Sequence, residues 1–293
     1  MDIRVLRYFL AICEEGNMSR AARALHVTQP TLSRQIAELE RELGCELLER
    51  GARTAVPTEK GRYLRRRAEE IVSLADQAAQ NLKRDDTLVE GDVAIGAGES
   101  EGMHTLAEQI WEFRQKHPHV RFHLRSGNST DVIDWLEHGL VDFAVLMSYR
   151  SIDRYPHLRL APIDTWGVLI PEGDELCRHD AIAPKDLAKL PLIVSEQALD
   201  SGEMQGWLGS TRDSLNVAAT YNLAFNAGQL VRQHVGYALA LDKLVSTGEN
   251  TGLVFRPLDP PLTSVIDFAW KQGQAFTSAS KRFLDQMEKA ARA

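Results

Sequence analysis

The segment from Ser19 to Leu43 constrains the fold more than any other part of this 293-residue chain. Its pattern predicts two short helices joined by a tight turn. We expect Ser19 and Thr28 to be helix N-caps, because a side-chain oxygen there accepts from free backbone N–H groups. Pro30 follows in the first turn of the second helix, where its missing N–H costs nothing.

The second of these helices has one apolar and one polar face. Apolar residues at spacings of four, three and four predict a single buried stripe: Leu32, Ile36, Leu39 and Leu43. The other face begins with short or forked side chains that suit base edges and phosphates: Gln29, Thr31, Ser33 and Arg34. This pattern is typical of a helix-turn-helix whose second helix enters the DNA major groove. The alternative is a helical hairpin in the core of another domain, with the polar residues simply solvated.

The flanking segments complete a winged helix-turn-helix. An amphipathic support helix comes first, with apolar residues at Ile3, Leu6, Phe9, Leu10 and Cys13. The stretch from Glu46 to Thr58 reads as two short strands around Gly51, which predicts a wing. Arg50 and Arg53 would then lie near phosphates or a narrow minor groove. The predicted DNA-contacting residues are Ser19, Thr28, Gln29, Pro30, Thr31, Ser33, Arg34, Arg50 and Arg53.

In these motifs the chain resembles the LysR-type transcriptional regulators. The segments that carry the resemblance are Leu6–Leu10, Ser19–Ala22, Leu25–Ile36, Leu39–Gly44, Leu47–Arg50 and Thr58–Gly61. The resemblance implies an α/β protein with a winged helix-turn-helix, a long dimerisation helix and a two-lobed effector domain like a type 2 periplasmic binding protein. It also implies a homodimer, paired into a homotetramer, on double-stranded DNA with an interrupted palindromic operator. RNA polymerase is a further candidate partner.

Overall charge does not by itself indicate DNA binding. Residues 1–86 hold 15 Lys and Arg against 14 Asp and Glu, whereas residues 87–293 hold 19 against 27. The DNA-binding prediction therefore depends on the local placement of Arg34, Arg50 and Arg53 beside a strongly acidic remainder. A dimer would double those contacts, which is one physical reason to expect one.

A long helical pattern runs from Glu59 to about Lys83, without proline and with one glycine, Gly61. Its apolar residues recur as in an a/d heptad seam: Leu64, Ala68, Ile71, Ala75, Ala78 and Leu82. We expect dimerisation along this seam, because it has nothing to pack against unless a second helix arrives. The alternative is that the effector domain covers it.

The predicted organisation has three parts. Residues 1–58 form the DNA-binding domain, 59–86 the linker and dimerisation helix, and 87–293 the effector-binding domain. Beyond Gly91, strand and helix patterns alternate, which predicts mostly parallel sheets with helices on both faces.

The resemblance divides the effector domain into lobe I, about 91–162 and 265–293, and lobe II, about 163–264. The chain would cross between the lobes near Ala161–Trp166 and return near Arg256–Ser264. The last helix, Ser278–Ala290, would pack on lobe I.

Open α/β sheets bind ligands beyond the carboxyl ends of their strands, near helix N-termini. In this chain the corresponding effector-binding candidates are Glu99, Ser100, Glu101, Asn128, Ser129, Ser195, Glu196 and Asn226, with Thr130 and Gln197 beside them. The alternative is that these are ordinary caps and loop residues. Because Glu99 and Glu101 flank Ser100, we expect a neutral polar or cationic effector unless Arg125 or another cation compensates.

No catalytic, metal or cofactor site is expected, and the chain is not expected to be an enzyme. The glycines at Gly96 and Gly98 begin a dinucleotide-like pattern, but the third, Gly102, comes one residue late. Three nearby histidines straddle a helix end and a strand and need not converge on a metal: His117, His119 and His123. The only small molecule expected is an effector of unknown identity.

We expect a cytoplasmic protein. Met1 leads directly into the support helix without a signal peptide, and no apolar run approaches the ~20 residues that span a bilayer. The scattered Cys13, Cys45 and Cys177 fit a reducing compartment.

Two other classes of function fit less well. A binding protein or enzyme with a helical extension would need a secretion signal or a catalytic set. An architectural DNA-binding protein would be more basic and would need no α/β appendage.

Overall fold

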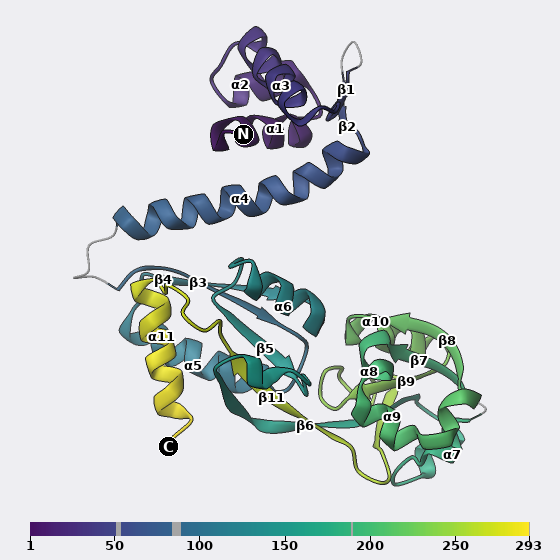
Figure 1. Ribbon diagram of the computed structural model, residues 1–293. Coiled ribbons are helices and arrows are strands. Elements are labelled where there is room, and N and C mark those ends of the chain that lie inside the picture. The colour runs from purple at the N-terminus through teal and green to yellow at the C-terminus, as the bar shows by residue number, and fades with distance from the viewer. Residues whose placement is uncertain (51–53, 84–88, 189, 293) are drawn as a thin grey trace. The chain divides into compact units, whose positions relative to one another are not determined.

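The structure is a computed structural model that describes residues 1–50, 54–83, 89–188 and 190–292. The chain divides into two compact units, Met1–Asp85 and Asp86–Ala293. Each unit has hydrophobic cores of its own, and both are traced in Figure 1. No helix in these described ranges is long and apolar enough to cross a membrane.

The first unit is a winged helix-turn-helix followed by a long helix. Its elements are α1 (Ile3–Glu15), α2 (Met18–Ala24), α3 (Gln29–Leu43), β1 (Leu48–Arg50), β2 (Ala55–Pro57) and α4 (Glu59–Lys83). Helices α1 and α3 share a core in which Phe9, Ile12, Leu32 and Ile36 have no exposed surface. The wing strands β1 and β2 pair antiparallel, with Leu48 opposite Pro57. The winged helix-turn-helix expected from the sequence is therefore confirmed.

The two predicted caps differ in outcome. Thr28 is the N-cap of α3, and its side chain accepts from the backbone N–H of Thr31 at 3.4 Å, as predicted. The prediction for Ser19 is wrong, because α2 is capped by Asn17, whose side chain accepts from the N–H groups of Ser19 and Arg20 at 2.9 Å. Ser19 lies exposed within the first turn of α2 instead.

The apolar stripe of α3 ends earlier than predicted. Leu32, Ile36 and Leu39 are buried, but Leu43 is 41% exposed. The helix ends at Gly44, which has a left-handed backbone with φ of 66°. The last turn of α3 extends beyond the shared core, so the spacing alone overstated the buried length.

Helix α4 packs against its own domain through the first half of the predicted seam. Leu64 is 9% exposed and Ala68 is fully buried, both in the core shared with α1. The argument that the whole seam requires a second chain is therefore wrong for this half, because α1 covers it. Ala75 is half-buried further along, and the side chains of Ala78 and Leu82 lie outside the described residues.

The second unit consists of two lobes joined by crossing strands. Lobe I contains β3 (Gly91–Ala97), α5 (Gly102–Lys116), β4 (Val120–Ser126), α6 (Ser129–Glu137), β5 (Phe143–Met147), β11 (Thr263–Ala269) and α11 (Ser278–Ala290). Lobe II contains α7 (Pro184–Leu187), β7 (Pro191–Ser195), α8 (Glu196–Asp200), α9 (Gly202–Leu208), β8 (Asn216–Tyr221), α10 (Ala224–Arg232), β9 (Tyr237–Leu241) and β10 (Leu253–Pro257). Strand β6 (His157–Pro171) runs through both lobes.

The sheet is mixed rather than mostly parallel. Its strand order is β4-β3-β5-β11-β6-β9-β7-β8, with β10 beside β6. The β-α-β units give parallel pairs, β3 with β4 and β5, and β7 with β8 and β9. Strands β10 and β11 pair antiparallel with β6. Parallel neighbours need a crossover such as a helix, whereas these strands arrive without one, so the expectation of mostly parallel strands is wrong there.

The chain crosses between the lobes along β6. In lobe I, Leu160 of β6 lies opposite Ile266 of β11, and further along, Trp166 of β6 lies opposite Leu241 of β9 in lobe II. The chain returns between β10 and β11. Two neighbouring backbone passages therefore connect the lobes (Figure 1).

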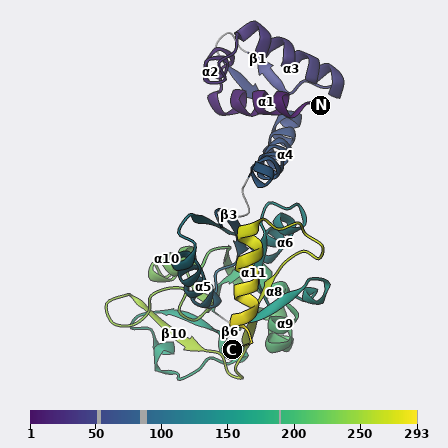
Figure 2. The ribbon, with the colours of Figure 1, turned by 90° about the vertical axis from the view of Figure 1, so that its left-hand side faces the viewer.

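Helices cover both faces of each lobe's sheet. In lobe I, α5 and α11 pack on one face through an aromatic cluster that includes Phe113, Phe143, Phe268 and Phe283. Helix α6 covers the other face. Figure 2 shows α11 against the strands of lobe I, as expected for the last helix. In lobe II, α9 and α10 pack in separate cores.

Candidate functional site

The first turn of α3 presents an exposed polar surface. Gln29, Pro30 and Thr31 are exposed, and the hydroxyls of Thr28 and Thr31 lie 2.8 Å apart. At 3.6 residues per turn, Pro30 and Arg34 face directly away from the buried stripe. Ser33 is half-buried at the side of the helix. This turn offers amide, hydroxyl and guanidinium groups to a groove without disturbing the core.

Arg34 has a neighbour of opposite charge. Its Nε lies 3.6 Å from Oε1 of Glu38, and 73% of the Arg34 side chain is exposed. Such an exposed pair one helical turn apart is weak. The guanidinium can therefore exchange Glu38 for a phosphate or a base edge.

The wing contacts remain predictions. Arg53 lies outside the described residues, and so does the side chain of Arg50. The base of the wing is fixed to the start of α4, since the Thr58 hydroxyl donates to the Glu46 carbonyl at 2.9 Å and accepts from the N–H of Gly61 at 3.0 Å. A Cβ on Gly61 would come within 2.0 Å of the Leu47 carbonyl oxygen, so this contact requires glycine.

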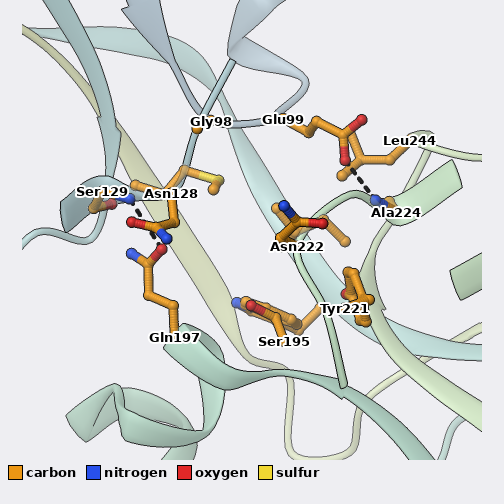
Figure 3. A pocket seen from close by; sticks show the side chains of 14 residues that line it. Gly98, Glu99, Asn128, Ser129, Ser195, Gln197, Tyr221, Asn222, Ala224 and Leu244 are labelled. Atoms are coloured by element: carbon orange, nitrogen blue, oxygen red, sulfur yellow. Dashed lines mark hydrogen bonds between the residues drawn. The ribbon is translucent and has the colours of Figure 1, made fainter. Parts of the chain in front are cut away.

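The second unit has a pocket between its lobes, called the interlobe pocket below, with a volume of about 110 Å³. It is lined by Gly98, Glu99, Gly127, Asn128, Ser129, Met147, Trp166, Ser195, Gln197, Tyr221, Asn222, Ala224, Leu241 and Leu244 (Figure 3). It lies beyond the carboxyl ends of β3, β4, β7 and β8, where the sequence placed a ligand site. A volume of this size holds several water molecules or a small metabolite.

The structure brings some of the predicted effector residues together. Glu99, Asn128, Ser129 and Ser195 line the pocket. Other candidates lie outside the lining: Ser100 is buried with an unpartnered hydroxyl, Glu101 pairs with Lys243 at 3.5 Å, and Thr130 is exposed. The side chain of Glu196 lies outside the described residues.

Asn226 was expected near a helix N-terminus at the ligand site, but it does not line the pocket. Helix α10 starts at Ala224, so Asn226 is its third residue, exposed and outside the lining. Asn222, just before the helix, lines the pocket instead. Asn222 directly follows β8, so a search for polar residues after each strand could have found it. Trp166 and Leu241 carried no local signal, because β6 and β9 bring them together across the sheet.

Two hydrogen bonds join the lobes at the pocket. Glu99 of lobe I accepts with Oε2 from the N–H of Ala224, the first residue of α10, at 2.5 Å. Gln197 of lobe II accepts with Oε1 from the N–H of Ser129, the first residue of α6, at 3.0 Å. Figure 3 shows both contacts as dashed lines. Each lobe thus places a side-chain oxygen on a helix N-terminus of the other.

The pocket has negative but no positive charge in its described lining, because Glu99 is its one ionisable carboxylate and no Lys, Arg or His is present. Burial, with the Glu99 carboxylate nearby, raises the pKa of Tyr221. Arg125 does not neutralise Glu99. Its guanidinium lies over the Trp135 ring, 3.9 Å from the centroid, and outside the lining.

A buried carboxyl group lies in the crossing strand. Asp164 of β6 is 2% exposed. One oxygen accepts from the N–H of Glu101 at 2.8 Å, and the other has no partner. Burial, with a contribution from the charge of Glu101, raises the pKa of Asp164 to about 6. The negative charge is therefore unfavourable at this position.

Comparison with known proteins decides the family. A model described as "Bacterial regulatory helix-turn-helix protein, lysR family" matches residues 3–62, and one described as "LysR substrate binding domain" matches residues 87–292. The chain belongs to the LysR family of transcriptional regulators. As a LysR-type regulator, it binds operator DNA through its winged helix-turn-helix and is controlled by a small-molecule effector in its C-terminal domain. It is not an enzyme.

Relatives span almost the full length of this LysR-type regulator. The SDS degradation transcriptional activation protein of Pseudomonas sp. (strain ATCC 19151) is 30% identical, over 90% of this chain and 87% of that protein. The uncharacterized HTH-type transcriptional regulator YvbU of Bacillus subtilis (strain 168) is 28% identical over 97% of each. The solved structure of full-length CbnR complexed with its target DNA has a TM-score of 0.74 at 19% identity, covering 99% of this chain and 100% of that one. At that identity the likeness concerns the fold.

Proposed function

We propose that this LysR-type regulator takes a small effector into the interlobe pocket, and that the effector is neutral and polar, or cationic. The observation that carries the proposal is the charge of the lining, one carboxylate without a cation. A small anion would meet Glu99 at short range in a partly desolvated space, where like charges repel more strongly than in water.

Other lining groups support the same chemistry. Amides and hydroxyls that can both donate and accept come from Asn128, Ser129, Ser195, Gln197 and Asn222. Trp166 and Tyr221 offer ring faces that attract a cationic head group. Met147, Leu241 and Leu244 can cover an apolar part of the same molecule.

For DNA, we propose that the first turn of α3 enters the major groove. Gln29, Thr31 and Ser33 would reach base edges while Arg34 reaches a base or a phosphate. Thr28 and Pro30 fix the start of the helix, and Ser19 on α2 is exposed toward solvent. Arg50 and Arg53 would contact the backbone from the wing.

For assembly, we propose a homodimer through the second half of α4, paired into a tetramer on an interrupted palindrome. The first half of the helix is covered by its own domain. In the second half, Leu74 is 39% exposed next to half-buried Ala75, which leaves apolar surface for a second copy. RNA polymerase is a further proposed partner.

The effector would control DNA binding through the arrangement of the two lobes. An effector that binds one lobe arrangement better than another shifts the population toward it by the difference in affinity. We propose that this shift changes the spacing of the DNA-reading helices in the assembly, which alters operator occupancy or geometry.

A ligand screen tests the effector proposal. Thermal melting of the full chain would be measured with matched panels of neutral polar, cationic and carboxylate metabolites. We expect ligands from the first two panels to raise the Tm. Asn222→Ala, in the pocket, should abolish that rise, whereas Asn226→Ala, on the same segment but outside it, should not. Stabilisation by mono- or dicarboxylates alone would overturn the proposal.

A further inference from the structure

Two hydrogen bonds join the lobes at the interlobe pocket, and each lobe supplies one of the two acceptors. The two acceptors differ in charge. At α10 the acceptor from the opposite lobe is the carboxylate of Glu99, and at α6 it is the neutral amide of Gln197. Both helices have nine residues, and the first N–H groups of such a helix have no carbonyl partner one α-helical turn earlier. These positions attract anions, because the N–H groups and the positive end of the helix dipole face the same point.

The charge of each acceptor is matched to the side chains in the first turn of the helix that it contacts. Helix α6 carries Asp131 in its first turn and Asn128 as its cap, so its N-terminus already has a compensating negative charge. Helix α10 has no acidic residue in its first turn, and its cap, Leu223, makes no side-chain hydrogen bond. The N-terminus of α10 thus has no capping side chain or acidic residue of its own, and the carboxylate of Glu99 supplies a side-chain partner from the other lobe.

A free anion competes poorly with Glu99 for the N-terminus of α10. Glu99 is attached to the same unit, so its carboxylate faces α10 at a high effective concentration. A free anion would have to displace it. The displaced charge would then remain in a pocket whose described lining contains no cation.

We propose that Glu99 is the charge filter of this pocket: it acts as a built-in ligand of the α10 N-terminus and thereby excludes anionic effectors. This inference rests on the interlobe pocket being the effector site. It identifies the residue that sets the charge class of the ligand. It also predicts that the pocket becomes an anion site once the Glu99 carboxylate is removed.

The test uses acetate, which matches the atoms that Glu99→Ala removes beyond Cβ. Thermal melting of the full chain is followed while acetate replaces chloride at constant ionic strength and pH. Glu99→Ala should lower the Tm of the effector domain by about 2–6 °C, because a charge-assisted hydrogen bond between the lobes is lost. Acetate should restore most of this loss with a saturating dependence on concentration, and it should leave the native protein unchanged.

Three further variants make the result specific. Glu99→Gln keeps an oxygen for the Ala224 N–H and should not respond to acetate. Glu249→Ala, an exposed glutamate away from the pocket, should behave like the native protein. Glu99→Ser opens the same space and should respond as Glu99→Ala does, so the test stands if the alanine variant fails to fold.

The contrary results are distinct from failure of the proposed function. Acetate that stabilises none of these proteins, or stabilises the native protein and Glu99→Gln as much as Glu99→Ala, would overturn the role of Glu99. The acetate titration does not involve the natural effector. If acetate rescues Glu99→Ala but no metabolite binds the native pocket, Glu99 still occupies the α10 N-terminus, but the effector proposal on which its role as a filter rests fails.

Discussion

At the scale of single residues, Arg34, which we propose contacts DNA, forms an exposed ion pair with Glu38. The pair is exposed on both sides and spans one helical turn of α3. Pairs of this kind contribute about 0.2–0.5 kcal/mol to a helix, which is small beside a base or phosphate contact.

We therefore expect opposite effects from the two partners. Arg34→Ala should weaken operator binding about 10- to 100-fold, because a base or phosphate contact is lost. Glu38→Gln should strengthen it about 1.5- to 2-fold, because the competing carboxylate is removed. Fluorescence anisotropy at fixed salt measures both. Asp285→Asn breaks a matched pair with Lys281 on α11 and should change nothing. Unchanged affinity in Arg34→Ala would contradict the proposed docking of α3.

Asp164 carries a second prediction at this scale, on pH. Its folded pKa of about 6 lies above the ordinary value of 3.8, so the folded state holds the proton more tightly than the unfolded state. Stability contributed by the proton is present below about pH 4 and is lost as the pH rises to 6 and above. By the usual conversion the loss amounts to at most about 3 kcal/mol.

Asp164→Asn should remove this loss, since an amide oxygen can still accept from the N–H of Glu101. Denaturant unfolding of both proteins at a series of pH values gives the comparison. The variant should gain stability relative to the native protein between pH 4 and 6 and keep the gain at neutral pH. Parallel pH profiles would show that Asp164 ionises in the folded state as it does in water.

Single residues were predicted from the sequence where the signal is local. Thr28 caps α3 because its oxygen is followed at once by helix-forming residues and Pro30. The prediction that Ser19 caps α2 was wrong because Asn17, two residues earlier, caps a helix equally well. A sequence pattern leaves the start of a helix uncertain by one or two residues. Trp166 and Leu241 were not predicted as pocket residues, because only the pairing of β6 with β9 brings them to the pocket.

At the scale of elements, the first turn of α4 depends on a close backbone approach. Gly61→Ala would place a Cβ within 2.0 Å of the Leu47 carbonyl oxygen. We expect α4 to be displaced from the wing, with a loss of about 1–3 kcal/mol in the first unit and weaker operator binding. Gly206→Ala in α9 meets no atom within 4 Å and should be neutral or stabilising. Equal thermal melting of the two variants would contradict this reading of α4.

Element boundaries were predicted best where periodicity and caps agree. The last helix spans Ser278–Ala290, as expected. Strands β9, β10 and β11 were not assigned, because their antiparallel partners are distant in the sequence. For α4 the heptad pattern was correct, but α1 covers its first half, because a heptad spacing does not say which surface packs against it.

At the scale of the whole molecule, the proposed homodimer uses the part of α4 that its own domain leaves uncovered. Replacing Leu74 by Glu, together with Ala75 by Glu, should convert the dimer to monomers, because two charges would be buried in an apolar contact. Sedimentation velocity measures the change, and circular dichroism verifies folding. A native protein that remains monomeric at the concentrations used for DNA binding would contradict the proposed assembly.

In the proposed mechanism, a metabolite bound to the second unit controls sequence-specific DNA binding by α3. The most direct measurement is competition for operator DNA selected from genomic fragments by the purified full chain. At moderate salt we expect an interrupted palindrome to be preferred over a scrambled duplex by a factor of about 10³ or more, with the preference reduced about 10- to 100-fold in Arg34→Ala. Equal and weak retention of both duplexes, with every metabolite panel present, would contradict it.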